Sequence, residues 1–223
     1  MKIKGAIFDM DGTLVDSLMF WDYLWRELGR MFLDTNDFKP SEEVDRNVRT
    51  MIFTSAMSYV KKQYGIKASE DELVRFATSK LADFYRYDVK VKRGVIEFLN
   101  YLKHQSVKMC IASATDMEYL RIAIESCGLS EYFEFVLSCA DIGKGKDQPD
   151  IYLMAQNTMG YRAEDICVFE DSYVALETAK AAGFKTVGIY DKYNFGQERL
   201  RDASMIYLSE SNSMDELIKE INN

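Results

Sequence analysis

The sequence predicts an α/β fold: a doubly wound parallel sheet that carries a small α-helical domain inserted after its first strand. Along most of the chain, short apolar runs alternate with segments of helical period, which is typical of parallel strands joined by helical crossovers. Only the stretch 17–88 breaks the alternation, with helical patterns and no convincing strand. The 223 residues suffice for one large domain or two small ones. We therefore expect a core domain formed by 1–16 and 89–223 and a helical domain at 17–88.

The strands of the core are predicted where apolar, β-rich runs end in polar or acidic residues. Six runs have this pattern: 4–9, 107–113, 133–138, 166–171, 186–190 and 205–208. Segments of helical period connect them at 93–104, 117–127, 150–159 and 173–182. In sheets of this kind, ligands bind beyond the carboxyl ends of the strands. The polar residues that close the strands are therefore the first candidates for a functional site.

The inserted stretch is predicted to be a set of helices. A second helix is expected to begin after Ser41, and a third at Ser69, which can cap the helix while Glu72 closes a capping box. The first helix has an apolar stripe with the spacing i, i+4, i+7 and i+11, formed by Trp21, Trp25, Leu28 and Phe32. This stripe is more typical of a packed helix face than of a ligand platform.

The charge and histidine content exclude several classes of protein. With 28 Lys and Arg against 36 Asp and Glu, the net charge is −8, so the chain as a whole repels nucleic acids and anionic lipid surfaces. His104 is the single histidine, which argues against histidine phosphatases and zinc hydrolases with several imidazole ligands. We expect no nucleic-acid or membrane partner, and a monomer.

The cysteines and the apolar segments indicate a cytoplasmic protein. The four cysteines form no CxxC pair and are expected to be reduced. None is followed six residues later by the arginine that a cysteine phosphatase requires. Carboxylates interrupt the apolar run after Phe8 before a signal-peptide core forms, and no segment approaches the roughly 20 apolar residues of a membrane span.

Two closely spaced carboxylates lie at the end of the first predicted strand. Asp9 and Asp11 lie one residue apart in the segment IFDMDGTLVDS, where the strand gives way to a loop. Two carboxylates this close ionise together only with a cation between them, or one of them holds a proton. Gly12 lets the backbone turn tightly and approach a ligand. The alternative is an ordinary Asp-Gly turn followed by Asp16-Ser17 as a helix N-cap.

The pattern DxDGTxxDS resembles the nucleophile motif of the haloacid dehalogenase superfamily, most of whose members are phosphatases. Three further motifs of that family follow in the right order. A serine closes the second core strand, a lysine precedes Pro-Asp, and an acidic pair follows an apolar strand; these are Ser113, Lys146 with Pro149-Asp150, and Glu170-Asp171. The layout is most similar to the β-phosphoglucomutase-like branch, which has a helical cap between the first two motifs. The core is then expected to be Rossmann-like, with 17–88 as its cap.

The resemblance implies a role for each matching residue. Asp9 is the nucleophile that forms an aspartyl phosphate, and Asp11 protonates the leaving alkoxide and later accepts a proton from water. Ser113, Ala114 and Lys146 hold the phosphate. Lys144 lies at the wrong spacing to Pro-Asp, so Lys146 is preferred as the catalytic lysine.

The resemblance also implies Mg²⁺ as the cofactor, because all the matching ligands are oxygen atoms. The ion would be held by Asp9, the backbone carbonyl of Asp11, Asp171, and Glu170 either directly or through water. An acid at Asp11 favours phosphate-ester chemistry, since dehalogenases carry a tyrosine there and phosphonate-cleaving relatives a small residue.

Two helix starts near these motifs are also predicted. Thr115 and Glu118 form the pattern of a capping box, so the helix after Ser113 is expected to begin at Thr115 and to direct its N-terminus at the phosphate. Ser172 is expected to cap the helix after the acidic pair.

The predicted function is a Mg²⁺-dependent phosphatase for a small phosphorylated metabolite, with two alternatives. The first is a sugar-phosphate mutase; β-phosphoglucomutases carry a histidine near the position of Trp21 and an arginine in the second cap helix region. The corresponding segment 50–54 has no basic residue, and a solvated helix face explains Arg46 and Arg49 at least as well. The second alternative is a non-catalytic binding protein on the same fold.

Overall fold

A central parallel sheet organises the larger of the two units into which the chain divides. The structure is a computed structural model and describes residues 2–49, 51 and 53–222. One unit comprises Met1–Leu18 with Val89–Asn223, and the other comprises Met19–Asp88. The sheet has the order β3-β2-β1-β4-β5-β6, and every pair of neighbouring strands is parallel. Its strands are β1 (Gly5–Phe8), β2 (Lys108–Ser113), β3 (Phe135–Ser138), β4 (Ile166–Glu170), β5 (Lys185–Ile189) and β6 (Ile206–Leu208). The predicted α/β class and the six strand positions are confirmed.

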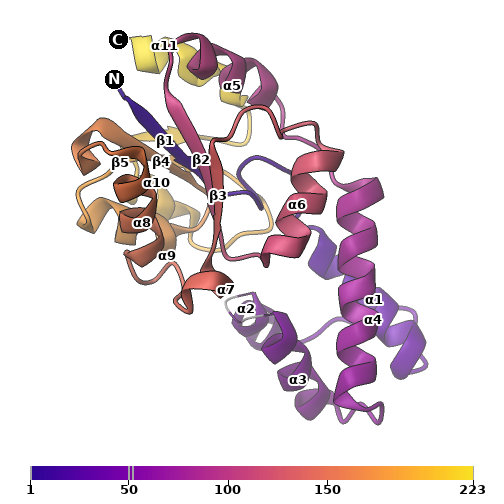
Figure 1. The fold of residues 1–223 in the computed structure, drawn as a ribbon. Helices are drawn as coiled ribbons and strands as arrows, with labels where there is room; N and C mark the ends of the chain where they lie inside the picture. The colour runs from indigo at the N-terminus through magenta and orange to yellow at the C-terminus, as the bar shows by residue number, and fades with distance from the viewer. Residues whose placement is uncertain (1, 50, 52, 223) are drawn as a thin grey trace. The chain divides into compact units, whose positions relative to one another are not determined.

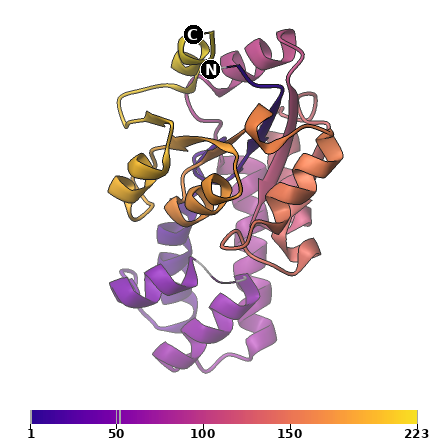
Figure 2. The same ribbon diagram turned by 90° about the vertical axis from the view of Figure 1, so that its left-hand side faces the viewer.

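Helices cover both faces of the sheet (Figure 1). They are α5 (Val95–His104), α6 (Met117–Ser126), α7 (Cys139–Ile142), α8 (Asp150–Met159), α9 (Tyr173–Ala181), α10 (Gln197–Ala203) and α11 (Leu217–Asn222), with 3₁₀ turns η2 (Ala163–Asp165) and η3 (Met214–Glu216). Figures 1 and 2 show α11 beside α5 at one end of this unit.

Strand β1 shows how the alternation of a strand builds the two layers of the core. Ile7 belongs to an apolar cluster with residues of α8, α9 and α10. The next residue, Phe8, faces the other way: its ring stacks on Phe169 of β4 at 4.4 Å between centroids and meets Phe98 of α5 edge-on at 6.3 Å. All four residues of β1 are buried, as expected for the middle strand of a sheet covered on both faces.

The register of the sheet brings the functional strand ends to one edge. Phe8 pairs with Ile111 of β2 on one side and with Phe169 of β4 on the other. The residues that follow Phe8 and Phe169 are Asp9, directly after β1, and Glu170, the last residue of β4, and they therefore lie at the same level.

The second unit is helical, as predicted. It contains α1 (Phe20–Phe32), α2 (Glu42–Val48), α3 (Phe53–Tyr64), α4 (Glu70–Asp83) and the π-helix η1 (Phe84–Asp88). Ser41 and Ser69 cap α2 and α4, since their side chains accept hydrogen bonds from Val44 N and Glu72 N. The sequence analysis did not predict α3 as a helix of its own between the helices that begin after Ser41 and Ser69. The segment 50–54 lies partly outside the described residues, because Thr50 and Ile52 are not among them.

The apolar stripe of α1 is only partly buried. Trp25 and Leu28 are buried, and Trp25 Nε1 donates to Asp45 Oδ1 at 2.7 Å. Trp21 and Phe32 are half-buried. Within the described residues, no helix is both long enough and apolar enough to cross a membrane.

The two segments that connect the units are joined to each other within the larger unit. Val15 and Val91 form an antiparallel bridge. Asp16 N donates to Lys90 O at 2.8 Å, and Lys92 N donates to Leu14 O at 2.9 Å. These bonds fix where the chain leaves the core and where it returns.

Candidate active site

The candidate site begins where β1 gives way to a tight loop. Asp9 follows the last residue of β1, and its backbone N donates to Phe169 O at 3.0 Å, so its position is fixed by the neighbouring strand. Gly12 has φ +77°, in the left-handed region, and a Cβ at this position would overlap Asp171 Oδ2. The glycine of the motif is therefore required both by the turn and by the close approach of Asp171.

Lys146 joins two carboxylates from different strands. Its Nζ lies 2.5 Å from Asp9 Oδ1 and 2.5 Å from Glu170 Oε1. Burial disfavours the charged form of Lys146, but the two carboxylates outweigh this effect and hold its pKa well above the usual value. Lys144 lies elsewhere, paired with Asp150 at 2.6 Å. The structure thus brings Lys146, and not Lys144, to Asp9.

Three buried carboxylates converge beside this lysine. One oxygen each from Asp9, Glu170 and Asp171 lies within 4.8 Å of the others. Burial raises the pKa of Asp9 to about 7; Lys146 opposes the shift, and Glu170 and Asp11 add to it. Burial, followed by Glu170 and Asp9, also raises the pKa of Asp171.

The chemistry of this donor set fits a hard divalent cation. The three carboxylates are at most 8% exposed, and burying like charges this close is unfavourable unless a cation or protons neutralise them. Oxygen ligands are the ones that Mg²⁺ prefers. Among the described residues, this is the single group of three or more His, Cys, Asp or Glu side chains that satisfies the spacing of a metal site.

The Asp11 carboxylate is not part of that group, and two hydroxyls orient it instead. Ser17 Oγ donates to Asp11 Oδ1 at 2.6 Å, and Thr115 Oγ1 donates to Asp11 Oδ2 at 2.7 Å. The sequence analysis predicted neither contact: it assigned Thr115 to a helix N-cap and considered Ser17 as one only in the alternative interpretation. In the structure, α1 begins after Met19 and α6 begins after Asp116, so neither residue is an N-cap.

The expected phosphate-binding residues lie at the end of β2. Ser113 is the last residue of that strand and is 1% exposed, and its Oγ accepts a hydrogen bond from Thr115 N at 3.2 Å. Ala114 follows and is exposed. Ser138 at the end of β3 donates from Oγ to Thr115 O at 2.8 Å. The loop after β2 is thereby tied to the neighbouring strand.

Different groups hold the two carboxylates at the end of β4, Glu170 and Asp171. Glu170 Oε1 meets Lys146, and its Oε2 accepts from Ser172 N at 2.9 Å. Ser172 precedes α9 as expected, but its side chain makes no capping bond. Asp171 Oδ1 accepts from Thr13 Oγ1 at 3.1 Å, and Asp171 Oδ2 accepts from Asn194 Nδ2 at 2.7 Å. Asn194, in the loop after β5, was missed by the sequence reasoning because it belongs to none of the four motifs.

Two features outside this group help to delimit it. In the helical unit, Arg49 is 13% exposed and pairs with Asp45 at 3.0 Å, and its guanidinium lies 5.9 Å from the Trp21 ring centroid. Arg49 is therefore largely buried and does not lie on a solvated face.

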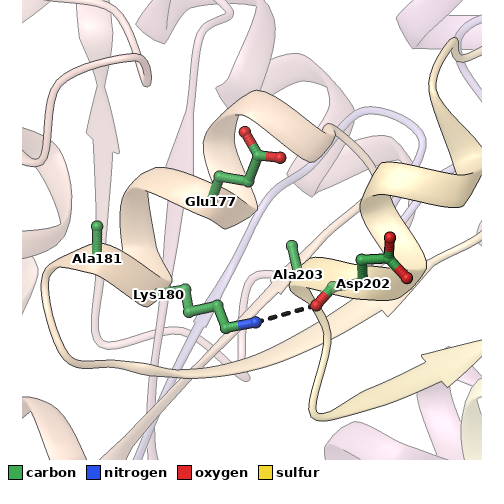
Figure 3. A pocket seen from close by; sticks show the side chains of 5 residues that line it. All are labelled: Glu177, Lys180, Ala181, Asp202 and Ala203. Atoms are coloured by element: carbon green, nitrogen blue, oxygen red, sulfur yellow. Dashed lines mark hydrogen bonds between the residues drawn. The ribbon is translucent and has the colours of Figure 1, made fainter.

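In the larger unit, a surface pocket between α9 and α10 is lined by Glu177, Lys180, Ala181, Asp202 and Ala203 (Figure 3). It contains no residue of the candidate site, and Lys180 Nζ donates to Asp202 O there.

A family model described as haloacid dehalogenase-like hydrolase matches residues 3–183. The chain is 27% identical to a putative phosphatase, YhcW, of Bacillus subtilis, over 85% of this chain and 84% of that protein. It is 24% identical to a phosphorylated carbohydrates phosphatase of Thermotoga maritima, over 98% of this chain and 100% of that protein. A crystal structure of a putative β-phosphoglucomutase from Thermotoga maritima superposes with a TM-score of 0.80, at 24% identity, and the match covers 99% of this chain and 100% of that one.

Proposed function

We propose, from the premise that the chain belongs to the haloacid dehalogenase-like hydrolases, that it is a Mg²⁺-dependent phosphatase for a small phosphorylated metabolite. The observation that carries the proposal is the convergence of Asp9, Glu170 and Asp171 around Lys146 at the carboxyl edge of the sheet. This set combines a nucleophile, oxygen ligands for a cation and a fixed positive charge, which phosphoryl transfer requires.

Asp9 is the proposed nucleophile. Attack of its carboxylate oxygen on phosphorus would form an aspartyl phosphate while the bond from phosphorus to the ester oxygen breaks. The contact between Lys146 Nζ and Asp9 Oδ1 supports this role, because it fixes the carboxylate and places a positive charge beside the developing charge on the phosphoryl oxygens. Ser113, Ala114 and Lys146 are the proposed phosphate-binding residues.

Asp11 is the proposed proton shuttle. It would donate a proton to the leaving alkoxide, and its carboxylate would then accept a proton from the water that hydrolyses the aspartyl phosphate. The hydrogen bonds from Ser17 and Thr115 support this role, because they hold both carboxylate oxygens of Asp11 in one orientation.

Asp9, Glu170, Asp171 and the backbone carbonyl of Asp11 are the proposed ligands of Mg²⁺. When bound, the ion would neutralise the carboxylates and stabilise negative charge on the phosphoryl group. Support comes from the three buried carboxylates whose oxygens lie within 4.8 Å of one another.

The substrate class we propose is phosphorylated sugars and related polyols. The relatives support it by their names: besides the phosphatase from Thermotoga maritima, the chain matches a hexitol phosphatase A of Escherichia coli at 25% identity over 85% of this chain. A sugar-phosphate mutase is the second candidate, since Arg49 is held beside Trp21 in the helical unit and is basic. Phosphorus NMR separates the two, because a phosphatase releases inorganic phosphate and a mutase yields an isomer.

We also propose that 17–88 is a cap domain and that 1–16 with 89–223 is the catalytic domain. The division of the chain at Leu18/Met19 and Asp88/Val89 supports these boundaries. We further propose that the protein is a cytoplasmic monomer. Its cysteines are free, and three of the four are buried, which fits a reducing compartment; size-exclusion chromatography with light scattering tests the oligomeric state.

The test is phosphate release from a panel of sugar, polyol, nucleotide and cofactor phosphates with Mg²⁺. Asp9→Asn should abolish turnover while leaving the circular dichroism spectrum unchanged. Lys146→Met should reduce turnover at least 100-fold, the order of magnitude for loss of one preorganised electrostatic group, and Lys144→Met is the matched control that should keep activity. Turnover by Asp9→Asn at the rate of the unaltered protein would refute the mechanism. A protein that binds phosphate esters without turning over any of them would favour the non-catalytic alternative.

A further inference from the structure

The loop between β5 and α10 reaches the acidic group through one side chain. Asn194 Nδ2 donates to Asp171 Oδ2 at 2.7 Å and to Asp171 O at 3.1 Å. Its Oδ1 accepts from Phe195 N at 2.9 Å. Because the carbonyl end of the amide is already bound to a backbone donor, the NH₂ end must face Asp171, which fixes the orientation of the amide group.

From these contacts we infer that Asn194 is a positioning residue that holds the Asp171 carboxylate in the orientation needed to bind a divalent cation. The inference rests on the proposed function, in which Asp171 is a metal ligand. Asn194 itself has no proposed contact with the metal or the substrate.

The Asp171 carboxylate needs such support. It is 3% exposed and lies close to Asp9 and Glu170, so in the absence of a cation like-charge repulsion favours rotation of its side chain away from the group. Two donors oppose this rotation, one on each oxygen: Thr13 on Oδ1 and Asn194 on Oδ2. Each oxygen has two lone pairs, so one hydrogen bond on each leaves capacity for a cation. A preorganised ligand binds a metal more tightly than one that must be ordered on binding.

The loop is itself anchored, which makes Asn194 a rigid support. Asp191 Oδ1 accepts from Tyr193 N at 2.9 Å, and Asp191 Oδ2 accepts from Lys92 Nζ at 2.7 Å. Gln197 Nε2 donates to Asp191 O at 2.9 Å and to Asn194 O at 3.3 Å. None of these anchoring bonds involves the amide NH₂ of Asn194. These anchoring bonds therefore remain when the amide of Asn194 is removed.

Gln197 supplies a matched control because it supports the same loop without contacting Asp171. The variants Asn194→Ala and Gln197→Ala would be compared with the unaltered protein by titration with Mn²⁺, in place of Mg²⁺, followed by electron paramagnetic resonance without substrate. We expect Asn194→Ala to bind Mn²⁺ about 10- to 100-fold more weakly, the usual cost of losing a group that orients a metal ligand. Gln197→Ala should change the affinity less than about threefold. Asn194→Ser, which keeps a donor on a shorter side chain, should lie between these two and replaces Asn194→Ala if that variant does not fold.

Two results would overturn the inference. The first is Mn²⁺ binding by Asn194→Ala that is as tight as in the unaltered protein. The second is an equal loss in Gln197→Ala, which would mean that loop order alone matters. Asp171→Asn separates this failure from failure of the proposed function: if that variant still binds Mn²⁺ with unaltered affinity, Asp171 is not a ligand and the metal site itself is wrongly placed. If Asp171→Asn loses binding and Asn194→Ala does not, only the role of Asn194 fails.

Discussion

In the absence of a bound metal, the free energy of unfolding of this protein should fall as the pH rises from 6 to 8. Burial raises the pKa of Asp9 from 3.8 to about 7, so the metal-free native state holds a proton that the unfolded state has already released. A group with a raised pKa in the folded state contributes stability below its unfolded pKa and loses it as the pH rises through the folded value. The loss therefore occurs between about pH 4 and pH 8; it is steepest at about pH 5 to 6, where only the native state holds the proton, and about half of that slope remains at pH 7.

The size of the effect follows from the shift. A change of about 3 pKa units corresponds to about 4 kcal/mol over the whole range, and about 1 kcal/mol of it is lost between pH 6 and pH 8. Mg²⁺ should reverse the trend, because it binds the ionised carboxylates and needs no proton to be retained. The stabilisation by Mg²⁺ should therefore be larger at pH 8 than at pH 6.

Urea unfolding followed by far-UV circular dichroism, at pH 6 and pH 8 with EDTA or with Mg²⁺, measures these differences. Asp9→Asn removes one of the two carboxylates with raised pKa values, the other being Asp171, and should make the dependence in EDTA shallower. His104→Gln is the control, since His104 is the single histidine and is exposed. Metal-free protein that is equally stable at both pH values, or an unchanged slope in Asp9→Asn, would refute the reasoning.

Three substitutions test other parts of the core and the helical unit. Lys92→Met leaves the carboxylate of Asp191, 5% exposed, without its ammonium partner, and should lower the free energy of unfolding by about 3 kcal/mol in urea titrations. Gly12→Ala combines a φ of +77° with an overlap on Asp171 Oδ2, and should lower Mn²⁺ affinity and phosphatase activity with little change in helix content by circular dichroism. Ser69→Ala removes the cap of α4 and should destabilise the helical unit by about 1 kcal/mol without affecting Mn²⁺ binding.

The sequence was sufficient for the strands and for the residues that follow them. The four inner strands of the sheet are short, mostly buried runs, so the apolar pattern of each ends where the strand ends, and Asp9 and Glu170 lie at two of those ends. The offset to Pro149 also distinguished Lys146 from Lys144, because the lysine of the family motif lies at that distance before Pro-Asp. Local patterns therefore predicted the residues whose positions depend on a single strand or turn.

Groups that act across the fold were harder to predict. Ser17 and Thr115 have the residue types and the neighbours of helix N-caps. The loop after β1 turns back so that Ser17 reaches Asp11, and Thr115 reaches it because the loop after β2 packs against the loop after β1. Asn194 lies 23 residues from Asp171 in a polar loop, and nothing in its local sequence marks it. Helix α3 was not distinguished from α2 because it follows that helix after a short break.

The charge of the site supports the proposed divalent cation. When all are ionised, Asp9, Glu170, Asp171 and the ammonium of Lys146 carry two negative charges together, and Lys146 is already shared between Asp9 and Glu170. A phosphate dianion brought to this point would be repelled, since in a buried site such charges are only weakly screened. A bound divalent ion cancels the excess and lets Lys146 act on the phosphate as well as on the carboxylates. A divalent cation is thus expected from the geometry of four side chains, independently of any resemblance in sequence, and Mg²⁺ is the one that we propose.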